Sequence, residues 1–326
     1  MSKIIYLCFY MILVPLALGC IWNVIFLDKV RVKRLIEEVL VRIYSVGLLL
    51  EFALWEMLYQ VLQRIDATYD ILMNNMLTTW RVCSIAFAFV AIILVILKRD
   101  SVRKGICILS DGSSEKKRRL YRNLFVVFYI IAAVLFVHPS QLDNTVNQMV
   151  DIMEFQIIAS HHEFIYVMLA SLCGIGVLPF THYILNGSLL LFFFGIYSYI
   201  EQILFKYNSR LQKVRTLMEC MFAVYLVLLL FIRGSLYIAV PQNIWNSSTM
   251  LASVILPFAF VYGYAFLMER KGIWLFKMVG MMLVVDLFYA KGYLFVGLLL
   301  FSAIIMYAVD KVLTSNVFQK KVKDED

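Results

Sequence analysis

Residues 4–27 read IIYLCFYMILVPLALGCIWNVIFL, an apolar run without one charged side chain. A helix of about 20 such residues crosses the roughly 30 Å hydrocarbon core of a bilayer. Eight further apolar runs follow, at residues 40–62, 79–97, 124–137, 187–205, 217–232, 250–268, 273–289 and 293–309. They are too long for barrel strands, which alternate over about ten residues. The sequence therefore predicts an all-α, polytopic bundle of transmembrane helices, with one domain over residues 1–313 and a short cytoplasmic tail at 314–326.

The composition places the chain among integral membrane proteins. Hydrophobic residues make up 63% of it and the mean hydropathy is +0.84, whereas a soluble domain is nearer half apolar. The lipid bilayer is thus the first predicted partner. We attribute the net charge of +8 to the Lys and Arg excess of cytoplasmic loops, and we do not expect nucleic-acid binding. The first run is too long for a signal peptide, so we expect it to be retained as a helix.

The distribution of charge predicts the orientation of the helices. The basic segments 28–38 and 98–122 are predicted to be cytoplasmic, because Lys and Arg concentrate on that side of a membrane. Two apolar runs separate these segments, which is consistent with the rule. The N-terminus is then predicted to lie outside. The segment 138–162 has no Lys or Arg and is predicted to lie outside as well.

The segment 163–180 decides whether the later loops obey the same rule. If it crossed the bilayer, the basic residues at 206–215, at 269–271 and in the C-terminal tail would all lie outside. Gly174, Gly176 and Pro179 interrupt it, so we expect a re-entrant or interfacial helix on the outer side. This gives nine full spans and a cytoplasmic C-terminus. Ten spans with a weaker charge bias are the alternative.

Ionisable residues inside apolar runs are functional candidates, because charge is costly at membrane depth. Glu56, Arg233 and Asp286 are such residues. The alternative for each is a side chain that reaches the interface or a structural pair between helices. We expect Glu56 to pack inside the bundle and not against lipid. Glu51, five residues earlier, is turned about 140° from Glu56 and need not share its pocket.

The predicted outer segment carries a second group of candidates. They are His138, Asp143, Asp151, Glu154, His161 and His162. Carboxylates and imidazoles together could hold a divalent metal or act as a general base. Their spacing matches no metal signature, so a solvated acidic loop is the alternative. The sequence contains no Walker loop, dinucleotide fingerprint or Gly-Xaa-Ser-Xaa-Gly elbow, which argues against ATP-driven transport and serine hydrolysis.

Three stretches carry a family resemblance. They are EFALWEML at 51–58, HHEFIYVMLASLCGIGVLPFTHYIL at 161–185 and IAVPQNIWNSSTMLASVILP at 238–257. In this order the chain resembles a family of bacterial polytopic membrane proteins, domain of unknown function 6077. Its members are similar to membrane-embedded C-type glycosyltransferases, of the GT-C fold, which use lipid-linked sugars.

The resemblance implies a site as well as a fold. It implies a bacterial plasma-membrane protein of the cell envelope, with a polyprenyl-linked sugar and other envelope polysaccharide proteins as partners. Asp143 would be the catalytic acid of the outer loop, as base or as ligand of a divalent metal. His182 matches a histidine of the family. Asn243 and Ser248 stand where the family has cations that suit a lipid-linked phosphate.

Three functions remain open on this basis. The first is sugar transfer from a polyprenyl-phosphate donor at the outer face. The second is a catalytically degenerate scaffold or subunit of a polysaccharide synthesis or export complex. The third is a transporter or flippase, which the ionisable residues inside the apolar runs favour.

Overall fold

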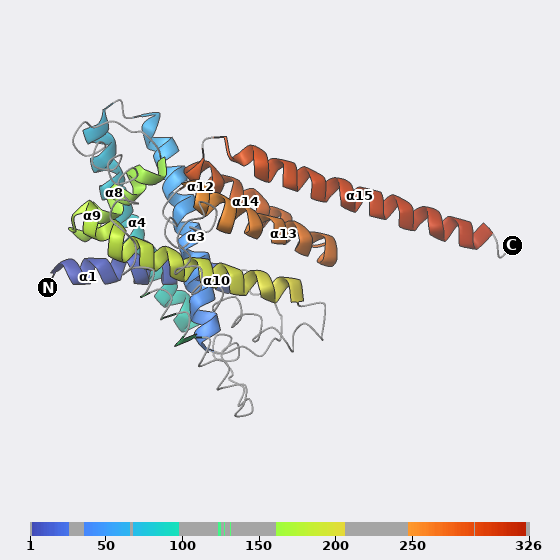
Figure 1. The fold of residues 1–326 in the computed structure, drawn as a ribbon, viewed down its shortest axis with the longest axis horizontal. Coiled ribbons are helices and arrows are strands. Elements are labelled where there is room, and N and C mark those ends of the chain that lie inside the picture. The colour runs from blue at the N-terminus through green and yellow to red at the C-terminus, as the bar shows by residue number, and fades with distance from the viewer. Residues whose placement is uncertain are drawn as a thin grey trace, which may run out of the picture.

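The computed structural model describes residues 2–25, 36–65, 68–97, 123–124, 127, 131, 161–205, 247–289 and 291–323. Every regular element in these segments is a helix (Figure 1). The predicted all-α class is therefore confirmed for this part of the chain. The predicted span at 217–232, and all but three residues of the one at 124–137, lie outside the described residues.

The helices form a series in which several are continuous with a wider π-helical turn. In chain order they are α1 (Ser2–Cys8), η1 (Phe9–Leu13), α2 (Val14–Ile25), α3 (Ile36–Gln63), α4 (Tyr69–Leu97), α8 (His161–Cys173), α9 (Val177–Pro179), η2 (Phe180–Leu185), α10 (Asn186–Phe205), α12 (Ser247–Met250), η3 (Leu251–Ile255), α13 (Leu256–Glu269), α14 (Gly272–Phe288) and α15 (Tyr293–Lys323). The last helix thus continues well into the predicted tail.

Six helical stretches are long and apolar enough to cross a membrane. They are Ser2–Asn23, Leu40–Gln63, Tyr69–Leu97, Val177–Glu201, Leu251–Glu269 and Tyr293–Val312. The predicted run at 273–289 forms α14, whose 17 residues extend about 25 Å and fall short of this set. The structure thus supports a multi-pass membrane protein with six candidate spans among the described residues. The count of nine for the whole chain stays a prediction.

Helix α3 lies at the centre of the bundle and contacts α2, α4, α8, α10 and α14. Its contact with α2 depends on glycine at two positions. A Cβ atom added to Gly19 would collide with the backbone carbonyl of Ile43, and one added to Gly47 would collide with that of Pro15. Small residues let helix backbones approach closely inside a membrane. The two glycines therefore set the spacing of α2 and α3.

The π-helical turns η1 and η3 precede prolines. Pro15 follows η1 by two residues and Pro257 follows η3 by two residues. A proline has no N–H and its ring clashes with the carbonyl four residues earlier, so the helix widens there. In the second case that carbonyl belongs to Ser253, and the hydroxyl of Tyr197 donates a hydrogen bond to it at 2.8 Å. The contact ties α10 to η3, the turn that leads into α13.

Helix α8 lies across one end of the bundle. It has 13 residues, about 20 Å, which is too short to cross a bilayer. Near its start, Phe164 contacts the ring of Tyr69 in the first turn of α4. At its far end the chain turns through Gly174, with φ of +65°, beside the side chain of Lys3 in α1. Both ends of α8 thus contact the first turns of other helices.

Apolar side chains cover the outward faces of α4 and α15. The exposed residues include Val82, Ile85, Phe89, Ile92 and Ile96 on α4 and Leu294, Leu298, Phe301, Ile305 and Val309 on α15. Their spacing of three or four residues makes one stripe along each helix. Such stripes suit contact with acyl chains, and Figure 1 shows α15 projecting beyond the other helices.

Candidate functional site

Three helices bring a cluster of ionisable side chains together at the end of the bundle where α8 lies. Glu56 and Gln60 are one turn apart on α3, Asp286 is in the last turn of α14, and His161 is the first residue of α8. Figure 1 shows the start of α8 beside α3, and α8 contacts both α3 and α14. The residues come from segments far apart in the sequence, so the fold assembles this site.

Hydrogen bonds link the four side chains into one chain. The Nδ1 atom of His161 lies 3.0 Å from Oε1 and 3.2 Å from Oε2 of Glu56. The amide of Gln60 donates through Nε2 to Glu56 Oε1 and to Asp286 Oδ2, both at 2.8 Å. The backbone N–H of Lys291 donates to Asp286 Oδ1 at 3.2 Å. One amide group therefore bridges two carboxylates, and one of these carboxylates also holds a histidine.

The geometry of the pair fixes the histidine's tautomer. A carboxylate only accepts hydrogen bonds, so Nδ1 of His161 carries the proton that it shares with Glu56. In the neutral ring, Nε2 then keeps its lone pair. Glu56 is completely buried, whereas the side chain of His161 is 31% exposed. A buried acid thus orients a histidine that remains accessible.

The two adjacent histidines have opposite electrostatic environments. The hydrogen bond with Glu56 raises the pKa of His161, and the charges of Glu56 and Asp286 act in the same direction against the effect of burial. For His162, burial lowers the pKa to about 4, and the neighbouring His161 adds to this. Glu163 lies 3.7 Å from His162, which is too long for a hydrogen bond, so burial dominates. Neighbouring groups with separated pKa values are a usual basis for acid–base roles.

Aromatic rings hold both histidines. The ring of Tyr59 lies 4.4 Å from that of His161, between centroids, and also contacts Phe164. The ring of His162 packs against Tyr166 and Phe288. These contacts fix the start of α8 on α3 and α14. They place His162 in the packing beneath the site, and His161 at its edge.

The structure joins three of the residues singled out in the sequence, Glu56, His161 and Asp286. Glu56 is buried inside the bundle, as predicted. Glu51 is also buried but separate from this cluster, as its angular offset suggested. Gln60 was missed, although its position four residues after Glu56 is the signal that could have found it.

The other predicted site residues are elsewhere. His182 lies in η2, where its ring contacts Tyr183, and no hydrogen bond joins it to Glu56 or Asp286. His138, Asp143, Asp151, Glu154, Arg233 and Asn243 lie outside the described residues, as does the side chain of Ser248. Their predicted roles therefore stay predictions.

A metal at the cluster is not supported by the residues that the structure places there. Among the described segments no three His, Cys, Asp or Glu side chains converge as metal ligands. At the cluster, the amide of Gln60 lies between the two carboxylates and hydrogen bonds to both. The arrangement suits the sharing of protons better than the binding of a divalent cation.

Comparison of the chain with protein-family models, curated proteins and solved structures gave no match.

Proposed function

We propose that the chain is a membrane-embedded, glycosyltransferase-like protein of the bacterial cell envelope that transfers sugar from a polyprenyl-phosphate donor. One observation carries the proposal: the buried carboxylate of Glu56 hydrogen bonds to Nδ1 of the partly exposed His161. A histidine that a buried acid orients is a common general base. The GT-C-like fold comes from the family resemblance, and the helical membrane bundle is compatible with it.

The chemistry assigns one step to His161. In the transfer, the bond between the anomeric carbon and the phosphate oxygen breaks, and a bond from that carbon to an acceptor oxygen forms. The acceptor hydroxyl loses its proton to Nε2 of His161, and the polyprenyl phosphate leaves. Glu56 and Asp286 then stabilise the imidazolium, as the raised pKa of His161 indicates. Gln60 holds the two carboxylates at a fixed separation.

The charge of the cluster favours an acceptor site over a donor site. With both carboxylates ionised, the net charge of the cluster is negative whether His161 is neutral, as a base must be before the transfer, or protonated after it. Such a cluster attracts a proton and repels a phosphate. The cations for the donor phosphate would come from elsewhere in the chain or from a partner.

The proposed topology places this cluster at the outer face. We propose nine spans, with α8 as the outer-side helix that does not cross, the N-terminus outside and the C-terminus cytoplasmic. Two observations support it: α8 is short, and its contacts are with helix ends that the charge pattern assigns to the outside.

The topology can be tested with introduced cysteines. Ser209→Cys and Ser315→Cys should both be protected from a membrane-impermeant thiol reagent in intact cells and should react after permeabilisation. The parent chain, with its own cysteines replaced, is the control. Labelling of the residue 209 variant in intact cells would favour ten spans.

The function is tested by deleting the gene and complementing it with variants. Glu56→Gln and His161→Asn should lower sugar transfer by about 100-fold or more, the usual contribution of a general base. Asp310→Asn, an exposed acid paired with Arg270, is the control. The readouts are surface polysaccharide, the pool of lipid-linked sugar and the protein level. Asp143→Asn examines the acid implied by the family resemblance.

The outcome of this complementation experiment distinguishes the transferase from the scaffold. Loss of polysaccharide with accumulated lipid-linked sugar supports the transferase. Normal polysaccharide in both variants, with loss in the deletion strain, supports the scaffold. An unchanged glycan in the deletion strain rejects an envelope-polysaccharide role.

A proton-coupled transporter is the second candidate, because His161, Glu56, Gln60 and Asp286 form a continuous hydrogen-bonded chain. Such relays are typical of transporters. It predicts that purified protein in vesicles takes up protons with its substrate, and that Glu56→Gln abolishes this uptake without any accumulation of lipid-linked sugar.

A further inference from the structure

A second polar site lies at the opposite end of the bundle from the Glu56 cluster. A small, open pocket, whose enclosed part has room for about one water molecule, is lined by Gly19, Trp22, Asn23, Arg42, Ile43, Val46, Tyr199 and Lys277. Arg42 precedes Glu56 by 14 residues on α3, which is about 21 Å along the helix. The pocket is therefore separate from the cluster, and four helices, α2, α3, α10 and α14, contribute to it.

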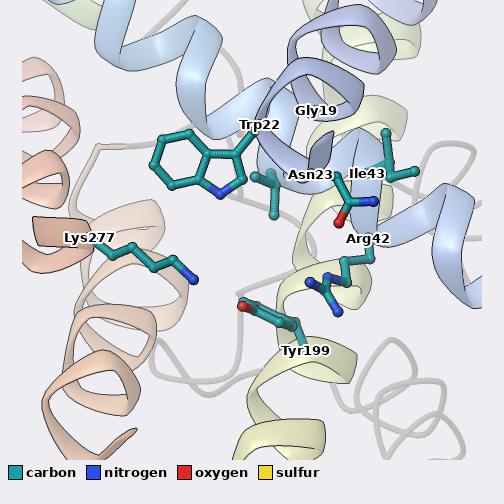
Figure 2. A pocket seen from close by; sticks show the side chains of 8 residues that line it. Gly19, Trp22, Asn23, Arg42, Ile43, Tyr199 and Lys277 are labelled. Carbon is teal, nitrogen blue, oxygen red and sulfur yellow. The ribbon is translucent and has the colours of Figure 1, made fainter. Parts of the chain in front are cut away.

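Two cations face each other in this pocket. Figure 2 shows the guanidinium of Arg42 and the ammonium of Lys277 directed from opposite sides into the space between Trp22 and Tyr199. Lys277 is only 7% exposed. Two positive charges on different helices repel each other at close range. Other contacts of the fold must therefore offset the cost of bringing these two cations together.

Aromatic faces contact both cations. The guanidinium carbon of Arg42 lies 4.6 Å from the centre of the Tyr199 ring, and Nζ of Lys277 lies 4.1 Å from that of Trp274. Cation–π contacts position a cation without cancelling its charge. No aspartate or glutamate is among the eight lining residues. The positive charge of the pocket is thus unneutralised by the residues that line it.

One hydrogen-bond donor of the pocket has no partner among the described residues. The Nη1 atom of Arg42 is buried and has no hydrogen-bond partner within the described part of the chain. An unpaired buried charged donor is costly, so such groups normally meet an anion. The amide of Asn23 and the indole of Trp22 line the same space and add neutral polar groups.

These features suit a phosphate at the surface of a membrane. Guanidinium and ammonium groups are the usual phosphate ligands. Basic pockets between transmembrane helices on the cytoplasmic side bind lipid headgroups, and tryptophan and tyrosine concentrate at that depth. The predicted topology puts this end of α2 and α3 on the cytoplasmic side, beside the basic segment 28–38. We infer that Arg42 and Lys277 bind the phosphate of an anionic lipid headgroup.

The test uses the full-length protein in lipid nanodiscs. Native mass spectrometry measures how much phosphatidylglycerol it retains against phosphatidylcholine. The double variant R42Q/K277Q should retain at least about tenfold less phosphatidylglycerol than the wild type, because it loses two charge-assisted contacts. The matched control R64Q/K291Q removes two exposed cations away from the pocket and should retain it as the wild type does.

Three further arms decide the interpretation. The Tm of the detergent-solubilised protein should rise with added phosphatidylglycerol but not with inorganic phosphate alone. If phosphate raises the Tm as strongly as the lipid does, the ligand is a free anion and the lipid assignment is wrong. Equal retention by R42Q/K277Q and its control would also overturn it. Because the double variant could fail to fold, R42K is measured too. It keeps the charge but loses the guanidinium fork, so retention should fall about threefold, and unchanged retention would remove Arg42 from the site.

Discussion

Replacing Glu56 with glutamine should remove the dependence of stability on the charge of His161. Glutamine keeps the size of the side chain and one acceptor oxygen, but it has no charge. The pKa of His161 is raised in the folded protein, so its charged form contributes stability. This contribution is fully present below the unfolded pKa of about 6.5 and is lost as the pH rises through the higher folded value.

The magnitude follows from the geometry of the pair. The contacts of 3.0 and 3.2 Å involve a completely buried carboxylate and a histidine that is 31% exposed. A hydrogen bond to a charged group contributes about 1.5–3 kcal/mol and a neutral one about 0.5–1.5 kcal/mol. The difference, discounted for solvent, is about 1 kcal/mol. Glu56→Gln should therefore cost about 1 kcal/mol more near pH 5.5 than near pH 9.

The assay is unfolding of the purified protein by a denaturing detergent, followed by tryptophan fluorescence over that pH range. Glu56→Gln, His161→Asn and the double variant form a cycle whose coupling should shrink as the pH rises. Asp310→Asn should show no such pH dependence. An equal cost of Glu56→Gln at both pH values would refute the assignment of the charge to His161.

Three other perturbations test the packing around the two sites. His162→Phe should remove the part of the acid-induced loss of stability that comes from His162. The neutral form of His162, whose pKa is about 4, stabilises the fold fully above about pH 6.5, and this contribution falls as the pH falls towards 4. The Tm measured between pH 7 and pH 5 shows the difference. Tyr197→Phe should cost about 1 kcal/mol in the wild type and nearly nothing beside Pro257→Ala, which restores a donor for the Ser253 carbonyl; additive costs in unfolding experiments would contradict this. Gly47→Ala should lower stability by about 1–3 kcal/mol because its Cβ meets the backbone of α2, whereas Gly280→Ala, with no atom within 4 Å of its Cβ, should not; equal Tm shifts would show that the α2–α3 contact is not tight.

The helices could be predicted from the sequence because apolar length alone determines them in a membrane. The boundaries were less accurate where polar residues occur inside a helix. The helix of residues 177–205 was predicted to begin only at 187, since His182 and Asn186 interrupt the apolar run. Inside the structure Asn186 is buried and His182 is half-buried, so hydropathy undervalued this stretch.

The site was only partly predictable. The burial of Glu56 followed from the cost of charge in hydrocarbon, but its partners did not. His161 and Asp286 are separated from the bonded residues of α3 by 105 and 226 positions, and no local pattern encodes such a contact. No local pattern predicts that Arg42 and Lys277 line one pocket. Their convergence depends on the crossing of helices that periodicity does not specify.

Helices α3 and α14 each contribute to both ends of the bundle. At one end Gln60 hydrogen bonds to Asp286, and at the other Arg42 and Lys277 line one pocket. A change in the tilt of one helix against the other would alter both distances together. If protonation of the cluster favours one tilt, it must change the affinity of the pocket for its anion, and the anion must change the proton affinity by the same factor. A measurement of headgroup retention as a function of pH would therefore show whether the two ends of the bundle are thermodynamically linked through this helix pair.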